Sequence, residues 1–269
     1  MTVAKYPKKI LFLAVVGVLA IVFVLATLFT SFTETQTDLS STIPLPLGGE
    51  DFMQAVESVV GSPRRLVDSD ITVIDNGDVF LADLLGEIAA AERSVTITNY
   101  IFREGKMANS VFDALAARAR EGIEVRVMLD GQGASEAPEE RIDAVVQAGG
   151  KVERFRPLSV RSLTRYHKRT HARAIVVDGE VGYTGGLAFD DGWLGDGVGE
   201  KQWRDVMLKY GGELARATQD QFNGFWRQTN GEILSGPAFY PVAPEPAAVV
   251  VADSAAGSSS SFVPLFHTP

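Results

Sequence analysis

RYHKRTHARAIVVDGEVGYTGGLAFDDGW, residues 165–193, is the stretch around which the rest of the chain is organised. His171, Arg173 and Asp178 are spaced as H-x-R-x-x-x-x-D, and the β-branched run at 174–177 predicts a strand. Along a strand, residues i and i+2 point to the same face, so the imidazole and the guanidinium are expected side by side. Such a pair suits a phosphoryl group, because the imidazole can attack phosphorus while the guanidinium binds the non-bridging oxygens.

Glycines and a further arginine extend this candidate site. Gly185 and Gly186 predict either a simple turn or a place where backbone N–H groups approach a phosphate. Arg169 belongs to a basic loop, 156–170, which fits a phosphate site, although a plain solvated basic face is the alternative. Asp178 followed by glycine is also an ordinary hairpin-turn signal.

The stretch resembles the HKD motif of the phospholipase D superfamily, H-x-K-x-x-x-x-D followed by Gly-Gly or Gly-Ser and an asparagine. The similarity is to the amino-terminal half of bacterial cardiolipin synthase-like proteins and covers roughly 70–236, including Asn99-Tyr100 and Trp203-Arg204-Asp205. The resemblance implies a phospholipase D-like α/β/α sandwich with a mixed sheet. It also implies a phosphohistidine on His171, an orienting role for Asp178, and no cofactor or metal.

Two positions depart from the family pattern. Arg173 stands where the family has lysine, and its bulk and fork geometry differ from those of an ammonium group. Ala188 stands where the family has asparagine and offers no amide. Loss of one preorganised donor lowers the rate by about 10²–10³-fold in other enzymes, so Ala188 counts against full activity. Both departures favour a silent binding module.

The resemblance implies a second motif as well, because a second histidine protonates the leaving alcohol and activates the acceptor. This chain carries one motif, so a homodimer or a second-motif subunit is expected to complete the site. The expected partner is a membrane phospholipid such as phosphatidylglycerol, and the acceptor decides the reaction. A phosphatidyltransferase that uses a second phosphatidylglycerol as acceptor forms cardiolipin, whereas water as acceptor gives hydrolysis. The alternatives are a catalytically silent lipid- or partner-binding module and, less favoured, a single-motif endonuclease.

An uncharged apolar run, 10–30, lies near the start of the chain. At about 1.5 Å per residue it spans the roughly 30 Å hydrocarbon core of a bilayer. Lys5, Lys8 and Lys9 precede it. This lysine bias predicts a protein that crosses the bacterial cell membrane once, with residues 1–9 in the cytoplasm and the main domain outside. The alternative is a cleaved signal peptide, whose apolar region is usually about 7–15 residues long.

Charge and composition limit the partners. The formal charge is −9, and three of the 25 basic residues but none of the 34 acidic ones precede the apolar run. The remainder therefore has 22 basic and 34 acidic residues, a net −12, which opposes nucleic-acid binding. Cysteine is absent, which excludes disulfides and thiolate metal sites, and the Gly/Asp-rich stretch 190–200 matches no calcium-loop spacing.

The rest of the chain divides into a linker at 31–50, a phospholipase D-like domain at 51–236 and a tail at 237–269 that resembles the truncated start of a second half. Alternating patterns predict an α/β sandwich around a largely buried sheet. A turn is expected at 75–78 and a short tail strand at 249–252. Strands are expected at 71–74, 94–102, 123–129, 152–155, 174–177 and 181–184, and helices at 80–91, 108–120, 138–148 and 212–227.

Overall fold

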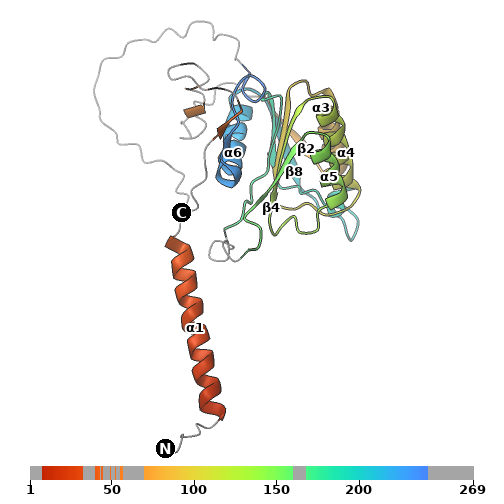
Figure 1. Cartoon of the computed structure of the whole chain (residues 1–269). Helices are drawn as coiled ribbons and strands as arrows, with labels where there is room; N and C mark the ends of the chain where they lie inside the picture. Colours follow the sequence, from red (N-terminus) through yellow and green to blue (C-terminus); the bar gives the residue numbers. More distant parts are fainter. Residues whose placement is uncertain are drawn as a thin grey trace, which may run out of the picture.

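The computed structural model describes residues 8–32, 40–42, 44, 49, 52, 55–56, 70–159 and 168–241. Its main body is a sheet with helices on both faces (Figure 1). Three helices cover one face and a single long helix crosses the other. The three are α3 (Gly77–Ala90), α4 (Lys106–Arg120) and α5 (Glu139–Gln147), and the fourth is α6 (Gly212–Asn230).

The central sheet of the described part has seven strands in the order β2-β8-β7-β6-β3-β4-β5. The pairs β3–β4 and β4–β5 are parallel, and the other four pairs are antiparallel, so the sheet is mixed as expected. The strands are β2 (Ile71–Asp75), β3 (Ser94–Asn99), β4 (Glu124–Asp130), β5 (Lys151–Phe155), β6 (Ala174–Val177), β7 (Val181–Gly185) and β8 (Val206–Tyr210).

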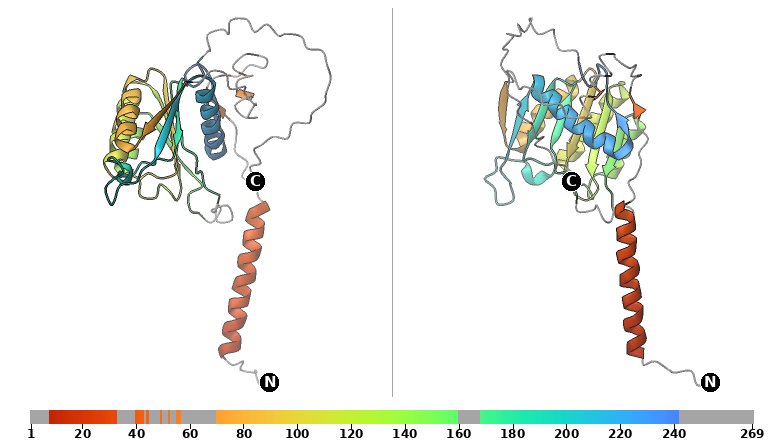
Figure 2. Two further views of the ribbon diagram at one scale, coloured as in Figure 1. Left: turned by 180° about the vertical axis from the view of Figure 1, so that it is seen from behind. Right: turned by 90° about the vertical axis from the view of Figure 1, so that its left-hand side faces the viewer.

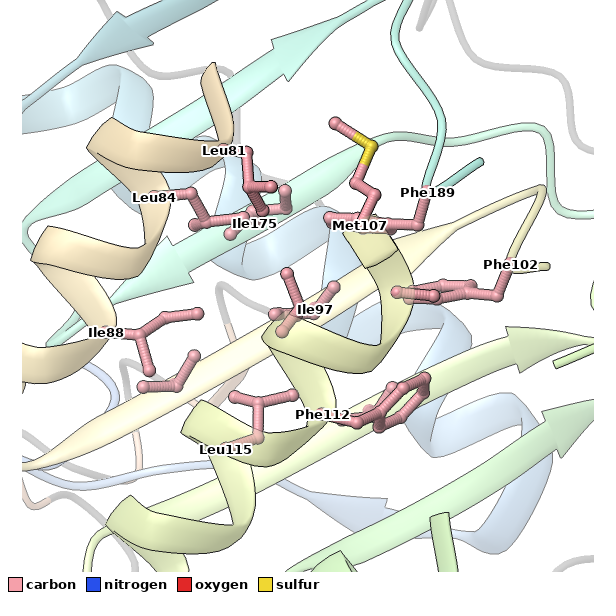
Figure 3. Packing of buried hydrophobic residues seen from close by; sticks show 14 of the residues in the cluster. Leu81, Leu84, Ile88, Ile97, Phe102, Met107, Phe112, Leu115, Ile175 and Phe189 are labelled. Atoms are coloured by element: carbon pink, nitrogen blue, oxygen red, sulfur yellow. The ribbon is translucent and has the colours of Figure 1, made fainter. Parts of the chain in front are cut away.

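The larger hydrophobic core lies between the sheet and the pair α3 and α4. Leu84 of α3 and Leu115 of α4 pack over Ile97 of β3 and Ile175 of β6, and all four are fully buried (Figure 3). Each such side chain contributes about 1.5–3 kcal/mol relative to remaining exposed. This packing fixes the middle strands, and with them the start of β6.

The opposite face of β3 is polar although it is equally buried. Ser94, Thr96 and Thr98 have no exposed surface beneath α6. The hydroxyl of Thr96 donates to Gln219 Oε1 at 3.0 Å, and that of Ser94 to the carbonyl of Ala238 at 2.6 Å. The sequence S-V-T-I-T-N therefore alternates polar and apolar residues although both faces of the strand are buried, and its polar face is satisfied by hydrogen bonds.

α3 begins earlier than the sequence suggests. A turn was expected over 75–78, but Asn76 alone turns the chain, with φ 64, and the helix starts at Gly77. A Cβ at Gly77 would lie 2.2 Å from the carbonyl oxygen of Trp193, so only glycine fits there. Asp78 lies in the first turn, where its negative charge stabilises the helix because it faces the positive end of the helix dipole.

α1 (Lys8–Phe32) contains the expected apolar run 10–30. Its side chains are exposed from Lys8 to Ala26, and Figure 2 shows the helix standing apart from the sandwich. By length and composition it is the one helix of the described part that could cross a membrane. Residues 1–7 lie outside the described residues.

Part of the expected linker is attached to the domain. β1 (Ser40–Ser41) pairs in parallel with β9 (Glu232–Ile233), which follows α6. The hydroxyls of Ser41 and Ser235 are 2.7 Å apart, and the Ser235 N–H donates to the hydroxyl of Thr42 at 2.9 Å. The chain therefore returns to the domain soon after α1.

The packed structure also continues past the expected domain end at residue 236. Phe239 and Tyr240 are buried against Phe222 and Trp226 of α6, and the Tyr240 hydroxyl donates to Asp220 at 2.8 Å. These aromatic residues close the α6 face of the sheet. The rest of the expected tail, with its strand at 249–252, lies outside the described residues.

Candidate active site at the motif edge

The motif residues gather at one end of the sheet, here called the motif edge. β2, β3, β4, β5 and β7 end there, while β6 and β8 begin there, as the strand pairings require. His171 and Arg173 lie immediately before β6. Loops meeting at such an edge bring together side chains that are distant in sequence.

His171 is in contact with an arginine and a tyrosine. Nη1 of Arg173 lies 3.0 Å from Nδ1 of His171 and 3.2 Å from its carbonyl oxygen. The ring of Tyr100, just after β3, is 4.7 Å from the imidazole, centroid to centroid. The imidazole and the guanidinium therefore lie side by side, as their spacing predicts, and the histidine is exposed.

The arginine contact determines the tautomer of His171. A guanidinium only donates hydrogen bonds, so Nδ1 of the imidazole accepts here and the neutral ring carries its proton on Nε2. A histidine attacks phosphorus through a nitrogen without a proton. With Arg173 in this place, His171 thus presents an N–H rather than a lone pair.

Arg173 is held on its other side by the sheet. Its carbonyl accepts from the hydroxyl of Thr184 at 2.8 Å, and its Nε is buried without a hydrogen-bond partner in the described structure. Burial lowers the pKa of the Arg173 guanidinium, and the negative charge of Asp205 partly offsets that decrease. An arginine remains charged regardless, so a fixed cation lies beside the histidine.

Asp205 is a site residue that the motif did not identify. It lies directly before β8, and a Cβ placed on Gly186 would be 2.0 Å from its Oδ2. Gly186 therefore leaves room for a carboxylate beside Arg173. Its own N–H donates to the carbonyl of Val206 at 3.0 Å, and a Cβ on Gly185 would meet that same oxygen at 2.4 Å. Both glycines thus allow close packing against β8.

Arg169 is engaged by the protein. Its Nη1 lies 3.5 Å from Oδ1 of Asp130, and its Nη2 donates to the carbonyl of Arg156 at 3.0 Å. Asp130 is fully buried and also accepts from the backbone N–H groups of Gln132, Gly133 and Thr170 at 2.9–3.0 Å. The end of β4 thereby fixes the residues that precede His171.

Asp178 lies at the other end of β6 from His171, which differs from the expected orienting role. Six residues lie between the two, and the four that form β6 alone span about 13 Å at a rise of about 3.3 Å per residue. The carboxylate accepts from the backbone N–H groups of Glu92, Arg93 and Ser94 at 2.7–2.9 Å. With φ 56 it also forms the hairpin turn to β7, so it connects β6 to the start of β3.

The acidic loop after β7 stabilises its surroundings. Asp190 contacts Arg103 at 2.7 Å, and the Asp191 carboxylate accepts from the N–H groups of Lys106 and Met107 at the start of α4. In the described part of the chain, no group of three or more His, Cys, Asp or Glu residues could hold a metal ion. Ala188 is fully buried in the core and contributes no polar group to the site. His167 and most of the basic loop lie outside the described residues.

Residues 84–226 match the family model described as cardiolipin synthase, phospholipase D-like domain. The chain is 32% identical over 167 residues to the cardiolipin synthase of Alkalihalophilus pseudofirmus, covering 62% of this chain and 33% of that one. It is 30% identical over 164 residues to the major cardiolipin synthase of Bacillus subtilis, covering 61% and 34%. The chain belongs to this family of phospholipase D-like domains, and it spans about a third of the length of these relatives.

Solved structures with similar folds include phosphatidylserine synthase from Haemophilus influenzae, with a TM-score of 0.46 and 14% identity over 72% of this chain and 44% of that one. Nuc, a phospholipase D family member from Salmonella typhimurium, has a TM-score of 0.45 and 17% identity over 60% and 97%.

Proposed function

We propose that this chain is a membrane-anchored phosphatidyltransferase of the cardiolipin synthase type, in which His171 forms a phosphohistidine with a phospholipid. Phosphatidylglycerol is the proposed donor and acceptor, and a second copy or a separate second-motif subunit supplies the other histidine. The observation that carries the proposal is the 3.0 Å contact between His171 and Arg173 at the open motif edge. It joins a nucleophile to the cation that phosphate oxygens require.

The reaction proceeds in two displacements. Nε2 of His171 attacks phosphorus, the phosphorus–oxygen bond to glycerol breaks, and the leaving alkoxide takes a proton from the second histidine. That histidine then removes the proton of the acceptor hydroxyl, whose oxygen attacks phosphorus and breaks the phosphorus–nitrogen bond. Water in place of the acceptor gives hydrolysis.

Binding of the substrate must first rearrange the arginine. A phosphate oxygen accepts from Arg173 more strongly than a neutral ring nitrogen does, because both partners of that hydrogen bond are charged. When the guanidinium moves to the phosphate, Nδ1 is free to take the ring proton and Nε2 gains the lone pair that it needs. The ring of Tyr100 packs against the imidazole at an interplanar angle of 42° and keeps it in place.

A second candidate is a catalytically silent module that binds phospholipid or a partner chain. The observation that favours it is the same hydrogen bond, because it leaves the proton on Nε2 as long as Arg173 stays on Nδ1. Buried Ala188 adds to this, since no amide is offered in its place. An endonuclease is the third candidate, which the −12 charge after residue 9 opposes.

Cardiolipin formation from phosphatidylglycerol vesicles by the purified full-length chain tests the proposal. We expect product from wild type and from the control Asp143→Ala, which changes an exposed residue of α5, and loss of at least about 10²-fold with His171→Ala. Product that persists in His171→Ala contradicts the phosphohistidine. Retained phosphatidylglycerol binding without product identifies the silent module, and DNA cleavage at low salt identifies the nuclease.

A further inference from the structure

Exposed apolar side chains gather around the motif edge. Leu158 follows β5 with 67% of its surface exposed, Val79 lies in the first turn of α3, and Val198 and Trp203 lie in the loop before β8 at 82% and 54%. Val79 and Leu158 come soon after β2 and β5 end at the motif edge, and Val198 and Trp203 come shortly before β8 begins there. We call these four residues the apolar rim. They lie along the motif edge, with Val79 beside β2 and Leu158 beside β5 at the two ends of the strand order, and His171 lies between them, just before β6.

Trp203 is held rigidly although it is exposed. Its ring packs edge-on against Trp193 at 4.3 Å between centroids, and its backbone N–H donates to the carbonyl of Gly192 at 2.7 Å. Trp193 itself is buried. A large ring fixed in this way loses little conformational entropy on binding, which suits it to an interface.

The neighbours of Trp203 indicate which kind of interface this is. Lys201 and Arg204 flank it and are exposed, while Asp196 and Glu200 lie earlier in the same loop. Tryptophan next to lysine and arginine is typical of the headgroup level of a bilayer, where the ring is half in apolar surroundings and the cations meet lipid phosphates.

The course of the chain keeps the domain close to such a surface. α1 ends at Phe32, and Ser40 is already paired with β9 of the domain. Eight residues reach at most about 28 Å when fully extended. If α1 spans a bilayer, Ser40 and its partner β9 cannot lie farther than this from the membrane surface. Glu232 of β9 bonds Lys151 at the start of β5, so this attachment point is at the end of the sheet opposite the motif edge. The segment therefore limits the distance of the domain, and the apolar rim has to set its orientation.

We propose that the apolar rim docks into the headgroup region of the bilayer, so that the motif edge opens directly onto the lipid surface. The inference rests on the proposed function only for the identity of the substrate, because the docking itself needs a bilayer and no turnover. Lipid phosphates would then approach Arg173 and His171 from the membrane side without leaving the interface.

Tryptophan fluorescence of the full-length chain in phosphatidylglycerol-containing nanodiscs tests this docking. The chain has three tryptophans, and Trp193 and Trp226 are buried, so the difference between wild type and Trp203→Phe reports Trp203. We expect brominated acyl chains to remove most of that difference signal, while acrylamide in the water leaves it intact. Unchanged thermal unfolding of Trp203→Phe establishes that the variant is folded.

A matched control uses the opposite end of the sandwich. Val146 is exposed near the carboxyl end of α5, away from the motif edge. In the double variant Val146→Trp with Trp203→Phe, the new ring should be quenched by acrylamide and not by brominated lipid.

Quenching of Trp203 by acrylamide and not by brominated lipid would overturn the docking. Protection from both quenchers would overturn it too, because it would show the rim covered by protein, such as a second copy. A chain that forms no cardiolipin but passes the quenching test leaves the docking intact and refutes only the proposed function. A chain that makes product in detergent micelles but fails the test refutes only the docking.

Discussion

Lysine and arginine differ in how they donate hydrogen bonds to a neighbouring histidine ring, and this difference matters at His171. An ammonium is a compact charge that turns freely, whereas the planar guanidinium of Arg173 places one N–H on Nδ1 at 3.0 Å while its carbonyl is held by Thr184. The arginine therefore selects one tautomer of the neutral histidine while the charge at position 173 stays the same. The motif alone does not reveal this difference, because lysine and arginine at this position carry the same charge.

Removing that donor should allow the ring proton of His171 to occupy either nitrogen. In Arg173→Met the stem remains but Nδ1 loses its donor, so we expect the neutral imidazole to change from one tautomer, protonated at Nε2, to a mixture. Nitrogen-15 shifts of the His171 ring, measured at about pH 8 where an ordinary histidine is neutral, check this. Arg204→Met, an exposed arginine of the motif edge, should leave the shifts unchanged; if it changes them equally, the contact is not the cause.

The sequence was informative about neighbours along the chain and less so about neighbours in space. The pairing of His171 with Arg173 follows from a spacing of two residues. Asp205 was noticed only as part of a similar segment, because its closeness to Gly186 depends on β8 lying beside β7. The functional roles of His171, Arg173 and Asp205 stay predictions.

Among the elements, β4 has the largest influence on the site, through the residue at its end. Asp130 is buried and accepts hydrogen bonds from both its own loop and the residue before His171. Asp130→Asn should lower the free energy of unfolding by about 3–5 kcal/mol, because an amide removes the buried negative charge that faces Arg169 and turns an NH₂ group toward several N–H donors. Urea unfolding measures this, and Asp143→Asn on the surface of α5 should unfold like wild type. Equal stability of Asp130→Asn and wild type would contradict this role.

Element prediction succeeded where hydrophobic pattern and terminators agreed. The expected strand 174–177 is β6 to the residue, and the helix expected at 212–227 continues to Asn230, where Gly231 with φ 80 ends it. β8 was not predicted, since V-M-L-K-Y carries no clear alternation and its position depends on pairing with β2 and β7. Gly77 and Asp78 were assigned to the turn because nothing in the sequence shows that the start of α3 packs on Trp193.

At the scale of the whole molecule, the proposed mechanism requires a second histidine from outside this motif. If two copies share one site, co-expression of equal amounts of wild type and His171→Ala should reduce cardiolipin formation to about a quarter, since only wild-type pairs keep both histidines. About half of the activity would remain if each chain worked alone or with a different subunit, which would contradict the homodimer. Co-expression with Asp143→Ala provides the undiminished reference.

The edge strand β2 has a consequence for the order in which the domain forms. Ile71 to Asp75 pair with residues 206–210, so β2 has no partner until about 130 more residues have been synthesised. At about 5–20 residues per second this wait lasts roughly 7–26 seconds. During that time α1 has already left the ribosome, and the apolar residues Ile71 and Val73 follow it with an unpaired backbone. α1 is therefore made early and the sheet is closed late, so a chaperone that shields β2 would act in this interval.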